Sequence, residues 1–202
     1  MLTKLIRLPY FLWLLCSLPA LGMVSALLTS SDPEIFEELL HGSGEFAARF
    51  MIVAMLATPL TMLLKGWRGP RFIMRHRRHF GVAAFGYGLL HTIFYMLDAG
   101  AVAVSAAELG QLYIWTGWIA FAIFIPLAAT SMDLAIRKLG PRNWKKIQQS
   151  TYVAALFTFV HWAALHDWEG LLPALVHFVP VLISVLYRLW AAWRRRGTPV
   201  PA

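Results

Sequence analysis

Four ionisable residues lie inside stretches of the chain that are otherwise apolar: His91, His161, His177 and Arg49. In a membrane-spanning segment such residues are costly, so they are candidates for a functional site by default. A neutral imidazole can give a nitrogen lone pair to a metal ion, and a guanidinium group can pair with a carboxylate. The residue types therefore suggest a set of metal ligands beside a cation that receives an anionic group.

His91 and His161 lie at matching depths in two of these stretches. His91 comes 12 residues after His79, and His161 comes 12 residues after Gln149. With a helical rise of about 1.5 Å per residue, each lies roughly 18 Å from the start of its stretch. Two imidazoles at one depth on separate helices can hold the iron of a flat macrocycle between them. The alternative for each histidine alone is a packed polar residue bonded to a backbone carbonyl.

His177 and Arg49 each leave two interpretations open. His177 lies about six residues inside its own stretch, so it is an alternative iron ligand or a donor to a haem propionate. Arg49 lies about four residues inside its stretch, where it can pair with a haem propionate or extend its guanidinium group to the lipid headgroups.

Membrane-spanning helices are the elements that must carry these residues. Hydrophobic residues make up 59% of the 202 residues and charged residues only 14%, whereas soluble domains have roughly 45–50% and 25%. We expect an all-α integral membrane bundle of about six transmembrane helices, forming one domain over residues 1–202. The expected spans, each close to the roughly 20 residues that a crossing needs, are 8–28, 46–64, 80–97, 112–132, 147–165 and 171–187.

Charge alternates between the segments that connect these spans. The N-terminus, the 65–78 and 133–146 segments and the C-terminal tail, counted from Arg188, hold 17 of the 18 Lys and Arg residues. The other connecting segments hold 9 of the 10 acidic residues. Because Lys and Arg favour the cytoplasmic side, we expect a multi-pass membrane protein with both termini in the cytoplasm. The acidic 29–45 segment is expected to hold at most a short surface helix.

A basic run within the 65–78 segment includes Arg75, Arg77 and Arg78. Its simplest role is to fix the topology, and its functional alternative is to bind an anionic flavin phosphate, a quinone or an anionic lipid. The sequence has no glycine-rich nucleotide-binding motif, so we expect the reductant to come from a partner or from the lipid. The single cysteine, Cys16, excludes a Cys-ligated zinc site or iron–sulfur cluster within one chain.

Several short motifs resemble one known family when they are taken in order. The sequence is similar to the haem-binding membrane subunit of the bacterial periplasmic methionine-sulfoxide reductase system, within the wider ferric-reductase-like transmembrane group. The resemblance covers roughly residues 30–190. It rests on His41-Gly42-Ser43-Gly44 with Ala48 and Arg49, Arg77-Arg78-His79-Phe80-Gly81, Leu90-His91-Thr92 with Tyr95, Leu127-Ala128-Ala129-Thr130-Ser131, Arg137-Lys138-Leu139-Gly140 with Trp144, and Tyr152 through His161.

The resemblance implies a six-span cytochrome that binds b-type haem, with His91 and His161 at the positions of haem-ligating histidines. It also implies electron flow from a cytoplasmic flavin reductase or the quinone pool to a periplasmic molybdopterin-containing reductase. The chain would then be an electron-transfer subunit of an oxidoreductase rather than its catalytic subunit. FMN or quinone is a further expected cofactor, and the role of His41 stays open.

Gln148 departs from the family pattern, which has a histidine 13 residues before the position of His161. Glutamine is a poor haem ligand, and 13 residues of helix place this side chain about 20 Å away, near the cytoplasmic face. We therefore expect one haem rather than two. The alternatives are a stand-alone ferric or oxygen reductase on the same scaffold, and a scaffold or transporter without a redox role.

Overall fold

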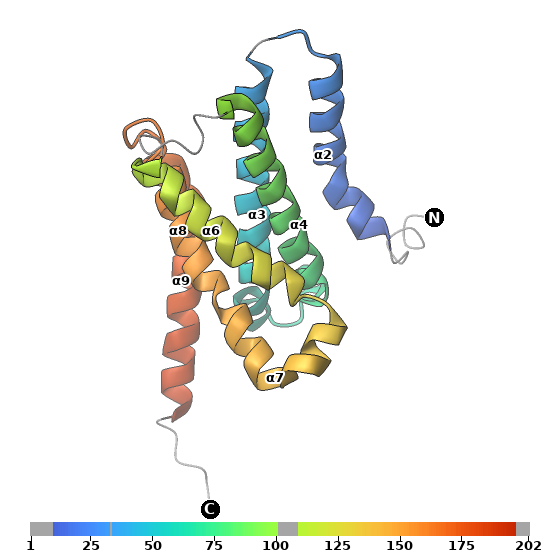
Figure 1. Ribbon diagram of the computed structural model, residues 1–202. Coiled ribbons are helices and arrows are strands. Elements are labelled where there is room, and N and C mark those ends of the chain that lie inside the picture. The colour runs from blue at the N-terminus through green and yellow to red at the C-terminus, as the bar shows by residue number, and fades with distance from the viewer. Residues whose placement is uncertain (1–9, 33, 101–108, 197–202) are drawn as a thin grey trace, which may run out of the picture.

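The computed structural model describes residues 10–32, 34–100 and 109–196, and within these ranges it contains helices and no strand. The expected all-α membrane bundle is confirmed. Figure 1 shows the chain running up and down the long axis of the bundle, with α7 joining α6 to α8 at one end. The helices are α2 (Phe11–Thr29), α3 (Ile35–Leu63), α4 (Arg68–Ala99), α6 (Leu112–Ala129), α7 (Asp133–Gln149), α8 (Thr151–Ala163) and α9 (Leu171–Arg196).

Five of these helices, α2, α3, α4, α6 and α9, are long and apolar enough to cross a membrane. The remaining expected span, 147–165, begins inside α7 and continues through the 13 residues of α8. Only Ser150 separates the two helices, and its backbone angles (φ −63°, ψ −10°) stay in the right-handed helical region. The residues of this expected span therefore form two consecutive short helices rather than one long helix.

Two helices begin well before the expected spans. α3 begins at Ile35 rather than at residue 46, so the acidic segment before the expected span is part of a spanning helix and not a separate surface helix. Glu37 and Glu38 in its first turn favour this early start, because negative charge stabilises the N-terminal end of a helix. α4 begins at Arg68 rather than at residue 80, so the basic run is helical.

α7 changes direction at Gly140. The backbone of this residue has φ +72°, in the left-handed region that glycine adopts without steric cost, and Pro141 follows. The part before Gly140 lies across the end of the bundle, and the part after it leads into α8 (Figure 1). No residue of α7 is buried.

The core of the bundle is built from small and aromatic residues at the helix contacts. α3 packs along α4, and α6 packs along α8. Ala48, Ala84 and Ala154 are almost completely buried there. Small side chains let helices approach closely, which is the usual way of packing helices in a membrane. Large apolar side chains such as Leu172, Leu182 and others on α9 face outward, as lipid-facing residues do.

Tyr87 on α4 attaches α2 to the rest of the bundle. Its hydroxyl donates to the Cys16 carbonyl at 2.8 Å and accepts from the Ala20 amide at 2.9 Å. These two backbone groups are four residues apart in α2, beside Pro19, which has no amide hydrogen. The buried tyrosine therefore satisfies both backbone groups in α2 next to the proline.

Candidate metal centre

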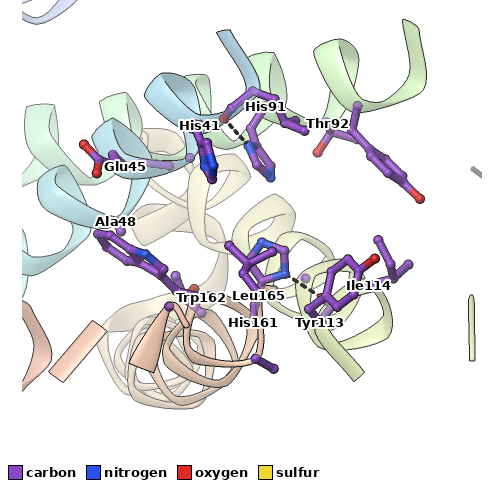
Figure 2. A pocket seen from close by; sticks show the side chains of 18 of the residues that line it. His41, Glu45, Ala48, His91, Thr92, Tyr113, Ile114, His161, Trp162 and Leu165 are labelled. Atoms are coloured by element: carbon purple, nitrogen blue, oxygen red, sulfur yellow. Dashed lines mark hydrogen bonds between the residues drawn. The ribbon is translucent and has the colours of Figure 1, made fainter. Parts of the chain in front are cut away.

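His91 on α4 and His161 on α8 face each other across a cavity between the helices (Figure 2). Their ring centroids are 5.8 Å apart and their ring planes are inclined by 88°. A metal–nitrogen bond of about 2.0–2.1 Å on each side, with about 1.1 Å from nitrogen to ring centre, puts two opposed imidazoles roughly 6 Å apart. The observed separation is therefore suited to two imidazoles that share one metal ion.

The hydrogen bonds of the two rings determine which nitrogen is free. Nδ1 of His91 lies 2.9 Å from the Leu40 carbonyl of α3, and Nδ1 of His161 lies 2.5 Å from the Tyr113 carbonyl of α6. Because a carbonyl only accepts, each Nδ1 must carry the hydrogen, which leaves Nε2 of the neutral ring with its lone pair. Histidines that bind metals usually donate their other N–H in this way, which fixes the ring and makes it more basic.

A glycine lies against each ring on the facing helix. A Cβ at Gly44 of α3 would lie 2.9 Å from Nδ1 of His91, and a Cβ at Gly117 of α6 would lie 2.7 Å from Nδ1 of His161. Each glycine is four residues after the residue whose carbonyl accepts from the ring. The absence of a side chain at Gly44 and Gly117 therefore gives each imidazole the room to reach its carbonyl.

The cavity that contains the two rings has a volume of about 1530 Å³. Binding sites for small molecules usually have roughly 300–1,000 Å³, so this cavity has room for a large ligand. Apolar and aromatic residues line its deep part, including Phe121, Phe124 and Trp118. Its mouth is acidic, and the described residues that line it include no Lys or Arg.

The donor set fits haem better than a bare metal ion. The described part of the chain holds no cluster of three or more His, Cys, Asp or Glu residues arranged for a metal ion. Two imidazoles alone leave most coordination positions of a metal unfilled, and a macrocycle supplies the four that they lack. The carbonyl-bonded rings, the two glycines and the size of the cavity therefore agree with a haem held between His91 and His161.

His177 and Arg49 lie next to each other rather than in this cavity. Nδ1–H of His177 donates to the Pro173 carbonyl at 2.8 Å, and Nε–H of Arg49 donates to Nε2 of His177 at 3.5 Å. Arg49 also forms an ion pair with Glu45 at 2.7 Å. With both nitrogens of His177 engaged, this side chain has no lone pair free for iron. Neither residue lines the cavity, although Arg49 directly follows Ala48, which does.

His41 lines the cavity from α3, on the same side as His91 (Figure 2). Its ring centroid is 5.8 Å from that of His166, in the segment between α8 and α9. His166, Asp167 and Trp168 all have positive φ, between 48° and 76°, which is unusual for residues other than glycine. His166 is exposed, and its contact with His41 brings the segment between α8 and α9 against α3.

A second cavity, of about 780 Å³, lies toward the opposite end of the bundle. Arg75, Arg77 and Arg78 line it together with Gln148, and the described residues that line it include no Asp or Glu. The side-chain amide of Gln148 donates to the Leu127 carbonyl at 3.2 Å and to the Thr130 hydroxyl at 3.0 Å. The two cavities therefore differ in charge, which matches the alternation of charge along the sequence.

Comparison with known proteins places the chain in a family. Residues 43–160 match the family described as ferric reductase like transmembrane component. The chain belongs to this family. The matched segment contains His91, Gly44 and Gly117, and it ends one residue before His161. No solved structure matches the chain.

Relatives of this ferric reductase-like chain carry the name protein-methionine-sulfoxide reductase heme-binding subunit MsrQ. The chain is 31% identical to that of Azospira oryzae, with 93% of this chain and 83% of the relative covered. It is 30% identical to that of Ralstonia nicotianae, with 90% and 84% covered. It is 32% identical to that of Brucella ovis, with 93% and 86% covered. The expected resemblance to this family is confirmed, and the chain is MsrQ-like over most of its length.

Two features of this MsrQ-like chain escaped the sequence analysis. Gly117 could not be singled out from the sequence, because glycines are common in apolar stretches. Its importance appears only when the structure shows the ring of His161 against it. The carbonyls of Leu40 and Tyr113 could not be identified as the partners of the two imidazoles either, since every residue has a carbonyl. Gly44, in contrast, lies in the His41-Gly42-Ser43-Gly44 motif and could have been noticed there.

Proposed function

We propose that this protein is a b-type haem electron-transfer subunit of the membrane, with His91 and His161 as the two axial ligands of one haem. The observation that carries the proposal is the pair of carbonyl-bonded imidazoles, 5.8 Å apart, on α4 and α8. The name of the relatives, which are called heme-binding subunits, supports it.

The chain's own residues bind and orient the cofactor. The Leu40 and Tyr113 carbonyls hold the rings, so that both ligands keep the tautomer that can bind iron. The apolar walls around Phe121 and Phe124 keep water from the deep part of the cavity. The haem, when bound, supplies an iron that changes its charge by one electron.

For Arg49 we keep the proposal of a propionate contact. The described lining of the cavity contains no Lys or Arg, and Arg49 is adjacent in sequence to Ala48, which lines the cavity. The contact requires the Arg49 side chain to leave Glu45 and His177, both of which it contacts through exposed atoms. The exchange gives the guanidinium group another carboxylate partner, the propionate, in place of Glu45.

We propose that electrons enter at the basic cavity and leave at the acidic one. The positive-inside rule puts the basic cavity at the cytoplasmic face of the bacterial inner membrane, with both termini on that side. Arg75, Arg77 and Arg78 can hold an anionic flavin phosphate there, or a quinone or lipid headgroup. The donor is a cytoplasmic flavin reductase or the quinone pool. The acceptor is a periplasmic molybdopterin-containing methionine-sulfoxide reductase, in keeping with the name of the relatives.

Absorbance spectra of the detergent-purified protein, oxidised and then reduced with dithionite, test this proposal. A pyridine haemochrome assay should give b-type haem at about one per chain. His91→Ala and His161→Ala should abolish haem retention, because each leaves iron with a single protein ligand. His177→Ala is the matched control, since it removes an imidazole at a similar depth that bonds to Arg49 and Pro173 instead.

Three outcomes would contradict the assignment. Full haem content in either His91→Ala or His161→Ala would remove that residue from the ligand set. Loss of haem in His177→Ala would make it a ligand. A wild-type protein without haem, from cells well supplied with haem, would end the cytochrome assignment altogether.

A further inference from the structure

Two buried hydroxyl groups occupy equivalent places beside the two imidazoles. Ser43 directly precedes Gly44 on α3, and Thr116 directly precedes Gly117 on α6. The exposed fraction is 0% for Ser43 and 1% for Thr116, so neither hydroxyl has access to water. Each must find its hydrogen-bond partner within the protein.

Each hydroxyl shares its single hydrogen between two carbonyls, and the more distant of the two is the carbonyl that accepts from a histidine. Ser43 Oγ lies 2.7 Å from the Leu39 carbonyl and 3.0 Å from the Leu40 carbonyl. The second of these is the acceptor of His91 Nδ1–H.

The arrangement on α6 repeats this one. Thr116 Oγ1 lies 2.6 Å from the Leu112 carbonyl and 3.1 Å from the Tyr113 carbonyl, which accepts from His161 Nδ1–H. In each case one carbonyl, three residues before the hydroxyl, serves both a hydroxyl and an imidazole. The same unit therefore occurs twice, on the helix that faces each histidine, although the sequence shows no evident internal repeat.

Ordinary helix packing explains a hydroxyl bonded to its own helix but not this coincidence. Ser and Thr within helices often bond to a carbonyl of the preceding turn. Thr61 at the other end of α3 does so too, with the Thr58 carbonyl at 2.7 Å. No histidine is bonded to the Thr58 carbonyl, so Thr61 shows the ordinary case beside the two special ones.

A shared carbonyl changes the strength of the bond to the imidazole. Each of these carbonyls accepts the helical bond from the amide four residues on, and the hydroxyl and the ring share its remaining capacity to accept. The hydroxyl draws electron density from the oxygen and makes it a weaker acceptor for Nδ1–H. A weaker bond at Nδ1 lowers the basicity of Nε2, the atom that would bind iron. Hydrogen bonding behind an axial ligand is one of the means by which a protein sets the potential of haem iron.

We propose that Ser43 and Thr116 are positioning residues that limit the basicity of the two haem ligands and thereby raise the midpoint potential of the haem. This inference rests on the proposed haem site between His91 and His161. Removing either hydroxyl leaves its carbonyl free to accept more strongly from the ring. The imidazole then stabilises oxidised iron more, and the midpoint potential falls.

The test is the midpoint potential of purified haem-loaded protein, measured by spectroelectrochemistry, together with haem content and the low-spin electron paramagnetic resonance signal. Ser43→Ala and Thr116→Val each remove one hydroxyl at nearly constant volume, and each should lower the midpoint potential and shift the resonance signal. The double variant should show the sum of the two shifts, since the hydroxyls act on different ligands. Thr116→Ser keeps the hydroxyl and should restore the wild-type potential.

Thr61→Val is the control, and its potential should equal that of the wild type. Equal potentials in Ser43→Ala, Thr116→Val and the wild type would overturn the inference, and so would a rise in potential. If Thr116→Val fails to hold haem, Thr116→Ser decides the matter: a wild-type potential supports the hydroxyl's role, and loss of haem there too overturns it. Failure of the haem site itself is separate, because it would appear as full haem content in His91→Ala or His161→Ala.

Discussion

Substituting Gly117 with alanine should displace one imidazole without disturbing the helix that carries the substitution. The new Cβ would lie 2.7 Å from Nδ1 and 3.0 Å from Cε1 of His161. Reaching an ordinary contact of about 3.5 Å requires the ring to retreat by roughly 0.8 Å. The ring is held by its bond to the Tyr113 carbonyl, so it cannot retreat without weakening that bond. Within α6 itself, alanine is favoured over glycine by about 1 kcal/mol.

The size of the effect on haem binding follows from this displacement. An extra methyl group in a packed site typically costs about 1–3 kcal/mol, and 1.4 kcal/mol corresponds to a factor of ten in affinity. We therefore expect Gly117→Ala to weaken haem binding by about 5- to 140-fold. Gly44→Ala should have a smaller effect, because its Cβ would lie 2.9 Å from Nδ1 of His91 and requires a smaller shift.

Titration of the haem-free protein with haemin, followed by absorbance, measures this affinity. Gly86→Ala on α4 is the matched control, because a Cβ there would meet nothing within 4 Å. It should bind haemin like the wild type. Wild-type affinity in Gly117→Ala would refute the argument, since it would mean that the ring can move away freely and that the close approach has no role in holding it.

Three further predictions concern other parts of the molecule. Tyr87→Phe removes the hydroxyl that joins the Cys16 carbonyl to the Ala20 amide, and it should lower the free energy of unfolding by about 1–3 kcal/mol. Proteolysis before α3 should become faster, and an unchanged melting temperature would contradict this prediction. Arg75→Gln with Arg77→Gln should slow haem reduction by the cytoplasmic donor while haem content stays constant; unchanged reduction kinetics would remove the basic cavity from the route. A C-terminal alkaline phosphatase fusion should be inactive and a C-terminal fluorescent fusion bright, because the basic tail favours the cytoplasm; the reverse pattern would invert the topology.

Depth along a helix could be predicted from the sequence, and direction around the helix could not. Counting residues put His91 and His161 at matching depths, and the structure brings their rings together. His177 points toward Arg49 instead, because the packing of α9 against α3 and α8 turns its ring away from the cavity. Neither the rotation of a helix nor its neighbours follow from the positions of its ionisable residues.

The residues at which the helices begin could not be predicted from the sequence either. A search for apolar stretches stops where charges begin, yet α3 continues through Glu37 and α4 begins at Arg68. Glu, Lys and Arg are good helix formers, so a helix can continue past the apolar core of the bilayer into water. The expected span 147–165, in contrast, is divided between α7 and α8, because a turn at Ser150 separates the two helices.

The Tyr87 bridge has a consequence for how the protein is assembled. Its hydroxyl joins an amide and a carbonyl that lie 67 and 71 residues earlier in the chain. Both groups belong to the series of backbone hydrogen bonds along α2. A single side chain on α4 therefore fixes the position of α2 along its axis to within one residue. If α2 slid by one residue, a buried hydroxyl and a backbone amide would lose their partners in an apolar medium, at a cost of about 1–3 kcal/mol. The depth of α2 in the membrane is therefore fixed by a side chain of α4, a helix that follows it in the sequence.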